Sequence, residues 1–247
     1  MRTKLLAGLI FGAFLGAWQM VCALGWVPPI LLPSPLDIGK YLIVSTFDGM
    51  LLSALGVTLS RLSIGYALGI ASGALIGLLL YRSALARATL GVIALGLQTL
   101  PSVCWAPLAL LWFGQSESAM YFVVVMGSLW AIALSTKEAI AAVPPIYIQA
   151  ARVMGSRGLH TWRTIIFPAA LPQLLNGARM GWAFAWRSLM AAEIYVTIIS
   201  RFGVGQLLHF GRELHAMDQA VAVMVVIVLV GFISDRLLFA PRKPRRA

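Results

Sequence analysis

Long apolar segments separated by short polar stretches run along the whole chain. A helix needs about 20 apolar residues to cross a bilayer, and six segments approach or exceed that length. They are Leu5–Trp26, Leu51–Tyr81, the uncharged run between Arg87 and Glu117, Ser118–Thr136, Leu174–Ser200 and Gln219–Phe239. The pattern predicts an all-α, polytopic membrane protein with six transmembrane helices.

The amino-acid composition also indicates a polytopic membrane protein. Hydrophobic residues make up 60% of the 247 residues, charged residues 11%, and the mean hydropathy is +0.90. A soluble domain carries about 25% charged residues. We therefore expect a single transmembrane domain over residues 1–247, surrounded by membrane lipid, with no separate soluble domain.

The N-terminus has two interpretations. Arg2 and Lys4 precede an apolar run, as in a secretory signal peptide. The run Leu5–Trp26 is longer than a typical signal-peptide core, and five further spans follow it. We interpret it as a retained first helix.

The net charge of +11 indicates topology rather than a nucleic-acid partner, because the basic residues lie at the ends of apolar runs. With six spans, one side of the membrane receives Arg2, Lys4, Arg82, Arg87, Lys137, Arg152, Arg157, Arg163, Arg236, Arg242, Lys243, Arg245 and Arg246. The other side receives Lys40, Arg201 and Arg212. The positive-inside rule predicts that both termini and residues 144–168 are cytoplasmic.

Glycines recur at intervals of four in two spans. Such a ladder lets another helix approach closely in lipid, where no hydrophobic effect drives helices together. The first ladder is Gly8, Gly12 and Gly16, and the second is Gly65, Gly69, Gly73 and Gly77. Both are predicted to be packing surfaces. The connector after the first span is rich in proline and is expected to hold a short surface helix after Pro35.

Residues 144–168 predict a short helix-turn-helix. Pro144-Pro145 is typical of a helix start, and Gly155 is typical of a left-handed helix end. A second segment, Leu159–Phe167, is expected to end at Pro168. One alternative is an interfacial hairpin that packs Ala, Val and Met side chains against its own bundle. The other is a surface that a partner protein binds.

The third span is interrupted by Pro101 and Pro107, and each is expected to kink the helix. Broken helices within a membrane occur where they face protein or a wet cavity. The polar residues Gln98 and Thr99 lie beside Pro101. The break is either architectural or part of a solute pathway.

Charged residues inside spans need a partner or water, because an isolated one costs several kcal/mol. Arg187 and Glu193 lie about 240° apart on their helix, so they cannot share one partner. Glu193 is interpreted as a structural partner of another helix, for instance of Arg61, which could otherwise snorkel to the outer interface. Arg187 is either paired or forms an electropositive constriction for a small anion. The pathway candidates are Arg61, Gln98, Thr99, Pro101, Arg187 and Glu193.

No sequence motif indicates an enzyme. No Gly-rich loop ends in Gly-Lys-Ser/Thr, so no nucleotide site is expected. Cys22 and Cys104 have no metal-ligand spacing, and a disulfide is not expected. His160, His209 and His215 fall in predicted loops.

Residues 149–168 carry a spaced pattern: Gln149-Ala150-Ala151, three residues, Gly155, nine residues, Ile165, one residue, Phe167-Pro168. The pattern resembles the cytoplasmic loop of ABC-importer permeases, in which Glu-Ala-Ala, Gly, Ile and Leu-Pro have this spacing. Gln149 stands in place of Glu and Phe167 in place of Leu. The resemblance implies that Gln149, Ala150, Ala151, Gly155, Ile165 and Pro168 couple the chain to an ATPase, without a carboxylate at position 149.

The resemblance extends beyond the loop, to the nitrate, sulfonate and taurine branch of these permeases. It is carried by Thr58-Leu59-Ser60-Arg61, Gln98-Thr99-Leu100-Pro101, Pro107-Leu108, Trp112-Phe113-Gly114, Ala191-Ala192-Glu193 and Gly203-Val204-Gly205. It implies a type I importer permease with a cytoplasmic coupling helix, in a bacterial inner membrane. Importers for cyanate, bicarbonate and vitamin precursors also occur in this branch.

The resemblance also implies partners. They are a cytoplasmic ABC ATPase dimer that binds ATP and Mg²⁺, a periplasmic or lipid-anchored substrate-binding protein, and a second permease copy, most simply in a homodimer. No cofactor is expected in this chain. The alternatives are a self-sufficient secondary transporter and a membrane scaffold without transport. The absence of a detectable inverted repeat and the scarcity of intramembrane carboxylates argue against the first.

Overall fold

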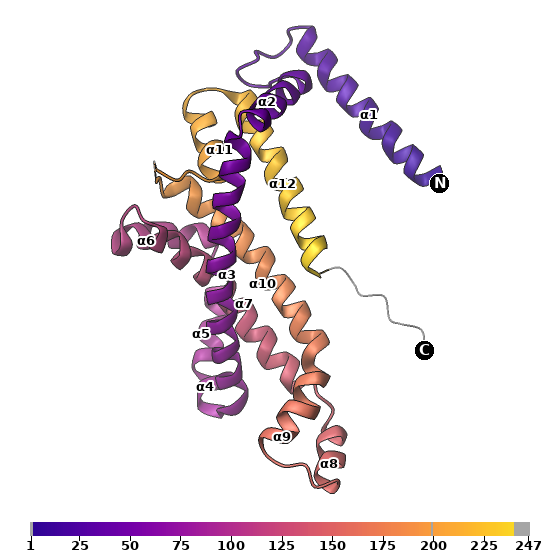
Figure 1. Ribbon diagram of the computed structural model, residues 1–247, viewed down its shortest axis with the longest axis vertical. Coiled ribbons are helices and arrows are strands. Elements are labelled where there is room, and N and C mark those ends of the chain that lie inside the picture. Colours follow the sequence, from indigo (N-terminus) through magenta and orange to yellow (C-terminus); the bar gives the residue numbers. More distant parts are fainter. Residues whose placement is uncertain (1, 199, 240–247) are drawn as a thin grey trace. The chain divides into compact units, whose positions relative to one another are not determined.

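The computed structural model describes residues 2–198 and 200–239, and every regular element in that part of the chain is helical. The elements, traced in Figure 1, are α1 (Arg2–Ala23), α2 (Pro35–Phe47), α3 (Met50–Arg82), α4 (Ala84–Ala88), α5 (Leu90–Thr99), η1 (Ser102–Trp105), α6 (Ala106–Phe113), α7 (Glu117–Ala141), α8 (Pro145–Val153), α9 (Leu159–Thr161), η2 (Trp162–Ile166), α10 (Phe167–Tyr195), α11 (Val204–Glu213) and α12 (Met217–Phe239).

The chain divides into two units. One comprises Met1–Leu59 and Thr197–Val230, and the other comprises Ser60–Val196 and Gly231–Ala247. Helices α3 and α12 contribute to both units. The single domain expected from composition stays a prediction.

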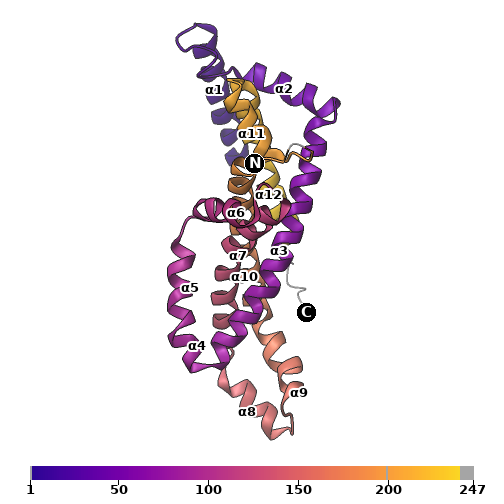
Figure 2. The ribbon, with the colours of Figure 1, turned by 90° about the vertical axis from the view of Figure 1, so that its left-hand side faces the viewer.

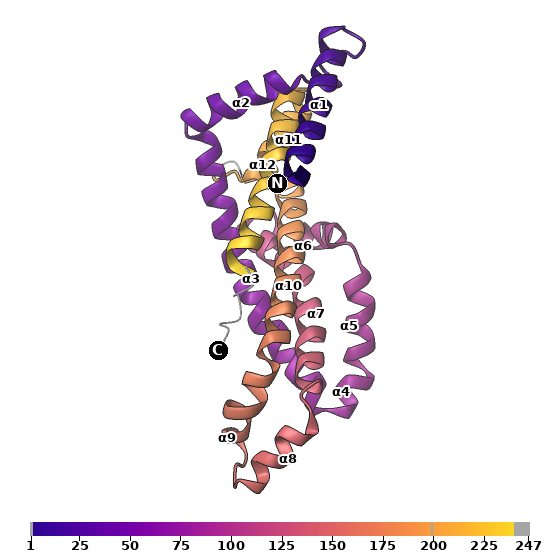
Figure 3. The same ribbon diagram turned by 90° about the vertical axis from the view of Figure 1, so that its right-hand side faces the viewer.

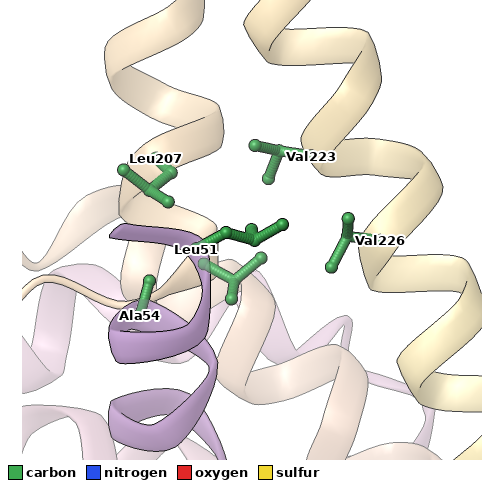
Figure 4. Packing of buried hydrophobic residues seen from close by; sticks show 6 residues of the cluster. Leu51, Ala54, Leu207, Val223 and Val226 are labelled. Carbon is green, nitrogen blue, oxygen red and sulfur yellow. The ribbon is translucent and has the colours of Figure 1, made fainter. Parts of the chain in front are cut away.

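In the first unit, an apolar core joins the start of α3 to α11 and α12. Figure 4 shows Leu51, Ala54, Leu207, Val223 and Val226 converging in this core. The predicted surface helix after Pro35 is confirmed as α2. Its N-terminus is capped by the Ser34 hydroxyl, which accepts from the Asp37 amide at 3.2 Å. The same hydroxyl donates to the Asp37 carboxylate at 2.7 Å, and this bond lowers the pKa of Asp37.

Residues from two of the spaced motifs meet at the start of α11. The Thr58 hydroxyl accepts a hydrogen bond from the Val204 amide at 2.8 Å, and the Gln206 side chain accepts one from the Gly203 amide at 2.8 Å. Both amides belong to a helix N-terminus, where backbone donors have no partner within the helix. The Thr58 and Gln206 side chains therefore satisfy a buried helix end.

In the second unit, α7 and α10 run side by side with the later part of α3 against them (Figure 1). The second glycine ladder is the contact surface. A Cβ atom on Gly65 would lie 2.7 Å from a Val124 methyl group, and one on Gly73 would lie 2.8 Å from the Leu129 carbonyl oxygen. The predicted packing role of Gly65, Gly69, Gly73 and Gly77 is confirmed.

The first ladder differs. A Cβ atom on Gly8, Gly12 or Gly16 would meet nothing within 4 Å. The predicted packing of this ladder therefore finds no partner among the described residues.

Within the part of the chain that the structure describes, three helices are long and apolar enough to cross a membrane: α3, α7 and α12. A fourth candidate is the bent pair formed by Ala84–Thr99 and Ser102–Phe113. Among the described residues of α1, Gly8–Ala23 form a shorter apolar stretch, and α10 is long but carries Arg179, Arg187 and Glu193. Helices occupy all six predicted segments, while the number of spans remains a prediction.

Two proline predictions are wrong. Pro107 was expected to kink a span, but it lies in the first turn of α6, where its missing N–H breaks no hydrogen bond. Pro168 was expected to end a helix, yet it lies in the first turn of α10, directly after the π-helical turn Trp162–Ile166. The chain is therefore helical without interruption from Leu159 to Tyr195.

Candidate functional site

A small cavity lies where the third apolar segment breaks. The segment bends by 105° between Thr99 and Ser102, with Pro101 at the break, and Figure 2 shows α5 and α6 running in different directions. The cavity has a volume of about 260 Å³. It is lined by Leu97, Gln98, Thr99, Leu100, Pro101, Ser102, Val103, Met126, Gly127, Phe184 and Arg187. Four of the six predicted pathway residues are thus brought together by α5, η1, α7 and α10.

Arg187 is the charged group of this cavity. Its Nε donates to the Ala183 carbonyl oxygen at 3.1 Å, and its guanidinium lies 4.9 Å from the centre of the Phe184 ring. These contacts orient the guanidinium and use one of its five N–H donors. Among the described residues, no carboxylate forms an ion pair with Arg187. The cavity therefore presents a positive charge with hydrogen-bond donors still available.

Neutral polar groups complete the lining. The Gln98 side chain makes no hydrogen bond within the described residues, whereas the Thr99 hydroxyl donates to the Gly96 carbonyl at 2.7 Å. Gln98 can both donate and accept, and the Thr99 oxygen can still accept. A guanidinium with an amide and a hydroxyl nearby is suited to the oxygen atoms of a small anion.

Phe184 and Gly127 also line the cavity and were not singled out from the sequence. Phe184 precedes Arg187 by three positions, a helical spacing that could have indicated a ring beneath the guanidinium. Gly127 is required because a Cβ atom there would lie 2.8 Å from the Ser188 Cβ and 3.5 Å from the Ser102 Cβ. Nothing in the sequence indicates this close approach of α7 to α10 and η1.

Arg61 and Glu193 lie elsewhere, in a buried charge cluster. Arg61 makes a bidentate pair with Glu117, with both N···O distances at 2.8 Å, and a third hydrogen bond of 3.0 Å to Glu193. Arg61 is 1% exposed and Glu193 0%. The predicted pair between these two residues is confirmed, and the snorkelling alternative for Arg61 is wrong. Neither residue lines the cavity of Arg187.

The hairpin, residues 144–168, lies at one end of α7 and α10 (Figure 3). Pro145 begins α8 as predicted. Gly155 has φ +83°, its amide donates to the Arg152 carbonyl, and the Ser156 amide donates to the Ala151 carbonyl at 2.9 Å. This pair of bonds is the Schellman motif, in which glycine is favoured at the left-handed position. The predicted left-handed helix end is confirmed.

Burial of α8 contradicts the packing alternative. Val153 is 89% exposed and Met154 76%, although both were assigned to a face packed on the bundle. The side chains that pack inward are Ala151, buried at 1%, and Ile148, which joins a core with Ile140 and Ile166. Val153 and Met154 therefore form an apolar surface that no described residue covers.

The remaining coupling candidates are distributed along the hairpin. Gln149, Ala150 and Pro168 are exposed, and Ile165 is half-buried. In the second segment of the hairpin, Leu159 is 83% exposed, whereas Ile166 is buried. Residues 144–168 contain no aspartate or glutamate, so the hairpin is cationic throughout.

Some predictions fall outside the described residues. The side chains of Arg2 and Lys4 and the basic residues after Phe239 contributed to the orientation predicted from charge, and they are not among the residues the structure describes. The orientation stays a prediction. Within the described part, no group of three or more His, Cys, Asp or Glu side chains has the arrangement of a metal site.

Comparison with known sequences identifies the family. The profile of the family described as "Binding-protein-dependent transport system inner membrane component" matches residues 65–241. An ABC transporter permease protein of Methanocaldococcus jannaschii is 34% identical over 140 residues, which cover 57% of this chain and 52% of that protein.

Two relatives align over most of their length. A Bacillus subtilis protein named as an aliphatic sulfonates transport permease is 30% identical over 92% of this chain and 82% of its own. The taurine transport system permease protein of Escherichia coli is 26% identical over 90% of this chain and 81% of its own.

Two solved structures share the fold. A chain of the MetNI methionine ABC transporter, described as inward facing, matches with a TM-score of 0.60 and 20% identity over 76% of this chain and 94% of that chain. A chain of an amino acid ABC transporter with histidines matches with a TM-score of 0.63 and 17% identity over 80% and 95%. The type I importer permease fold is therefore shown.

Proposed function

Because the chain belongs to the binding-protein-dependent transport system inner membrane component family, we propose that it forms the membrane pathway of an ABC importer for a small oxyanion. Aliphatic sulfonates, taurine and nitrate are the expected substrates. Two relatives named for sulfonates and taurine support this substrate class.

The observation that carries the proposal is the cavity at the Pro101 break. Its about 260 Å³ is smaller than the roughly 300–1,000 Å³ of sites for drug-sized ligands, so it suits a small solute. The planar guanidinium of Arg187 matches the oxygen atoms of a sulfonate or nitrate through paired hydrogen bonds. Its carbonyl bond and its stacking on Phe184 hold it in place before a ligand arrives, which lowers the entropy lost on binding.

The hairpin is the expected site of coupling to the ATPase. The uncovered side chains of Val153 and Met154 suit an apolar cleft on a partner, and the tight turn at Gly155 permits close approach. The cationic character of residues 144–168 favours a cytoplasmic position. A second copy of this chain would complete the pathway, and a substrate-binding protein would deliver the solute from outside.

In this mechanism the chain binds the solute and guides it across the membrane, and ATP hydrolysis takes place on the partner ATPase subunits. Closure of two ATPase subunits brings the two hairpins together and opens the pathway toward the binding protein, and hydrolysis resets it. Arg187 would hold the solute while one side opens and the other closes.

The direct test is uptake by the reconstituted complex. In proteoliposomes with the ATPase and the binding protein, we expect ATP-dependent uptake of an aliphatic sulfonate, with competition from other oxyanions. A preference for an uncharged solute would overturn the oxyanion assignment. Uptake by this chain alone, driven by an ion gradient, would overturn the importer assignment.

Gly155→Leu tests the hairpin. A left-handed backbone costs a residue with a side chain about 1–2 kcal/mol, and the leucine side chain would also obstruct a partner. We expect the variant to insert into the membrane and to bind the binding protein, but to lose at least tenfold in uptake per ATP hydrolysed. Gly155→Asn is the matched control, since asparagine tolerates the left-handed region. Unchanged coupling in the leucine variant would remove the coupling assignment.

A further inference from the structure

A second and larger cavity lies beneath the hairpin, with a volume of about 640 Å³. It is lined by Arg82, Ile148, Arg152, Ser156, Arg157, Gly158, Leu159, Thr161, Trp162 and Ile166. We refer to this cavity as the arginine cleft. It is bounded by the end of α3, one face of α8, the turn at residues 156–158 and the helical segment that leads into α10.

The charges of the arginine cleft have no acidic partner among the described residues. Arg82, Arg152 and Arg157 line it, and no lining residue is acidic. In the part of the chain that the structure describes, none of these three arginines forms an ion pair. The hairpin contains no aspartate or glutamate that could pair with these arginines, and position 149 holds glutamine. Three like charges around one cavity repel each other, so an anion bound there would be stabilised.

The cleft also has polar and apolar parts suited to an amphiphile. The hydroxyl oxygens of Ser156 and Thr161 lie 2.9 Å apart at its wall, and either can serve an anionic oxygen. Ile148, Leu159 and Ile166 supply apolar surface, and Leu159 is 83% exposed. A free inorganic anion makes no favourable contact with this apolar surface, whereas the apolar part of a lipid does.

The arginine cleft lies where a membrane-crossing helix ends. Arg82 is the last residue of α3, a helix long and apolar enough to cross a bilayer. Its guanidinium lies 5.3 Å from the centre of the Trp162 ring, which packs edge-on against Tyr81. Tryptophan, tyrosine and arginine are enriched where helices leave the hydrocarbon core. Basic pockets at this level bind anionic lipid headgroups.

We propose that the arginine cleft binds the headgroup of an anionic phospholipid, with Arg82, Arg152 and Arg157 around its phosphate. The cleft occupies the face of α8 that carries Ile148 and Arg152, and leaves Val153 and Met154 outside it. A lipid in the cleft and a protein partner on α8 can therefore be present together. The bound lipid would brace the hairpin against the end of α3.

Native mass spectrometry of the purified chain tests this site. The chain in detergent is incubated with phosphatidylglycerol or with phosphatidylcholine, and the retained lipid is counted. We expect selective retention of phosphatidylglycerol, reduced about tenfold in an Arg152→Gln/Arg157→Gln variant. Arg163→Gln is the matched control, because Arg163 is an exposed arginine of the same hairpin that does not line the cleft. The replaced side chains are exposed, and an unchanged unfolding temperature will confirm that each variant folds.

Two further arms identify the source of the anion. Millimolar inorganic phosphate should not displace the lipid; displacement would show that the cleft holds a free anion instead. A Ser156→Cys variant should crosslink to a lipid carrying a reactive headgroup; exclusive crosslinking to a co-expressed ATPase would show that a protein occupies the cleft. Equal retention of phosphatidylglycerol by the double variant would overturn the proposal. None of these measurements depends on transport, so they stand apart from the test of the importer.

Discussion

Two arginines in apolar helices have opposite surroundings. Arg61 on α3 is buried at 1% exposure between the carboxylates of Glu117 and Glu193. Arg187 on α10 is exposed, rests on a phenyl ring and a backbone carbonyl, and lines a cavity. From sequence both were candidates for the same pathway. The comparison shows that the role of a charged residue within an apolar helix follows from its interaction partners and not from its depth in the membrane.

Energetics explain why the two positions serve different purposes. A buried guanidinium must be paired, because the desolvation of an unpaired ion costs several kcal/mol. At Arg61 the carboxylates supply that pairing, so the residue ties α3 to α7 and α10. At Arg187 the corresponding partner would have to arrive with the solute or with water.

Arg61→Ala should give the largest effect on stability. The change leaves Glu193, at 0% exposure, without its guanidinium. Breaking a buried pair in this way costs about 3–5 kcal/mol. We expect a marked drop in the unfolding temperature of the detergent-solubilised protein and poor insertion. A variant as stable as the wild type would show that the charge cluster is not structural.

Glu193→Gln should give an intermediate effect. It removes the charge at the 3.0 Å contact but keeps the bidentate pair between Arg61 and Glu117. A hydrogen bond to a charged group contributes about 1.5–3 kcal/mol, and glutamine retains part of it. A loss of stability equal to that of Arg61→Ala would mean that the three charges act as one inseparable unit.

Arg187→Gln should give the smallest effect on stability and a large effect on transport. Exposed side chains without ion pairs usually change stability by less than about 0.5 kcal/mol. Uptake of an oxyanion by the reconstituted importer should fall at least tenfold, with the unfolding temperature unchanged. Arg187→Lys separates charge from shape, because lysine lacks the planar fork. Full uptake by the glutamine variant would remove Arg187 from the pathway.

The two glycine ladders show how far sequence could go. Both ladders have the same spacing. The ladder from Gly65 to Gly77 packs tightly on α7, whereas a Cβ atom on any glycine of the ladder from Gly8 to Gly16 would meet nothing within 4 Å. The spacing predicts a surface for close approach, but it does not name the partner. Helix positions, the start of α8 and the turn at Gly155 were predictable, since each depends on local chemistry.

Features that depend on distant residues were not predictable. The grouping of Gln98, Thr99 and Pro101 with Arg187 requires the bend between α5 and η1 and the close approach of α10. The error at Pro168 has a related cause: nothing in the sequence indicates the π-helical turn at Trp162–Ile166, after which the helix continues through Pro168.

The uninterrupted helix from Leu159 to Tyr195 has a mechanical consequence. At about 1.5 Å per residue it is a rod on the order of 50 Å long, with its foot in the hairpin and with Arg187 and Glu193 near its far end. Torque applied at the foot reaches both side chains without passing through a loop. The π-helical turn at Trp162–Ile166 and Pro172 both interrupt the regular α-helical hydrogen bonds of this rod, so they govern how much of a twist is transmitted.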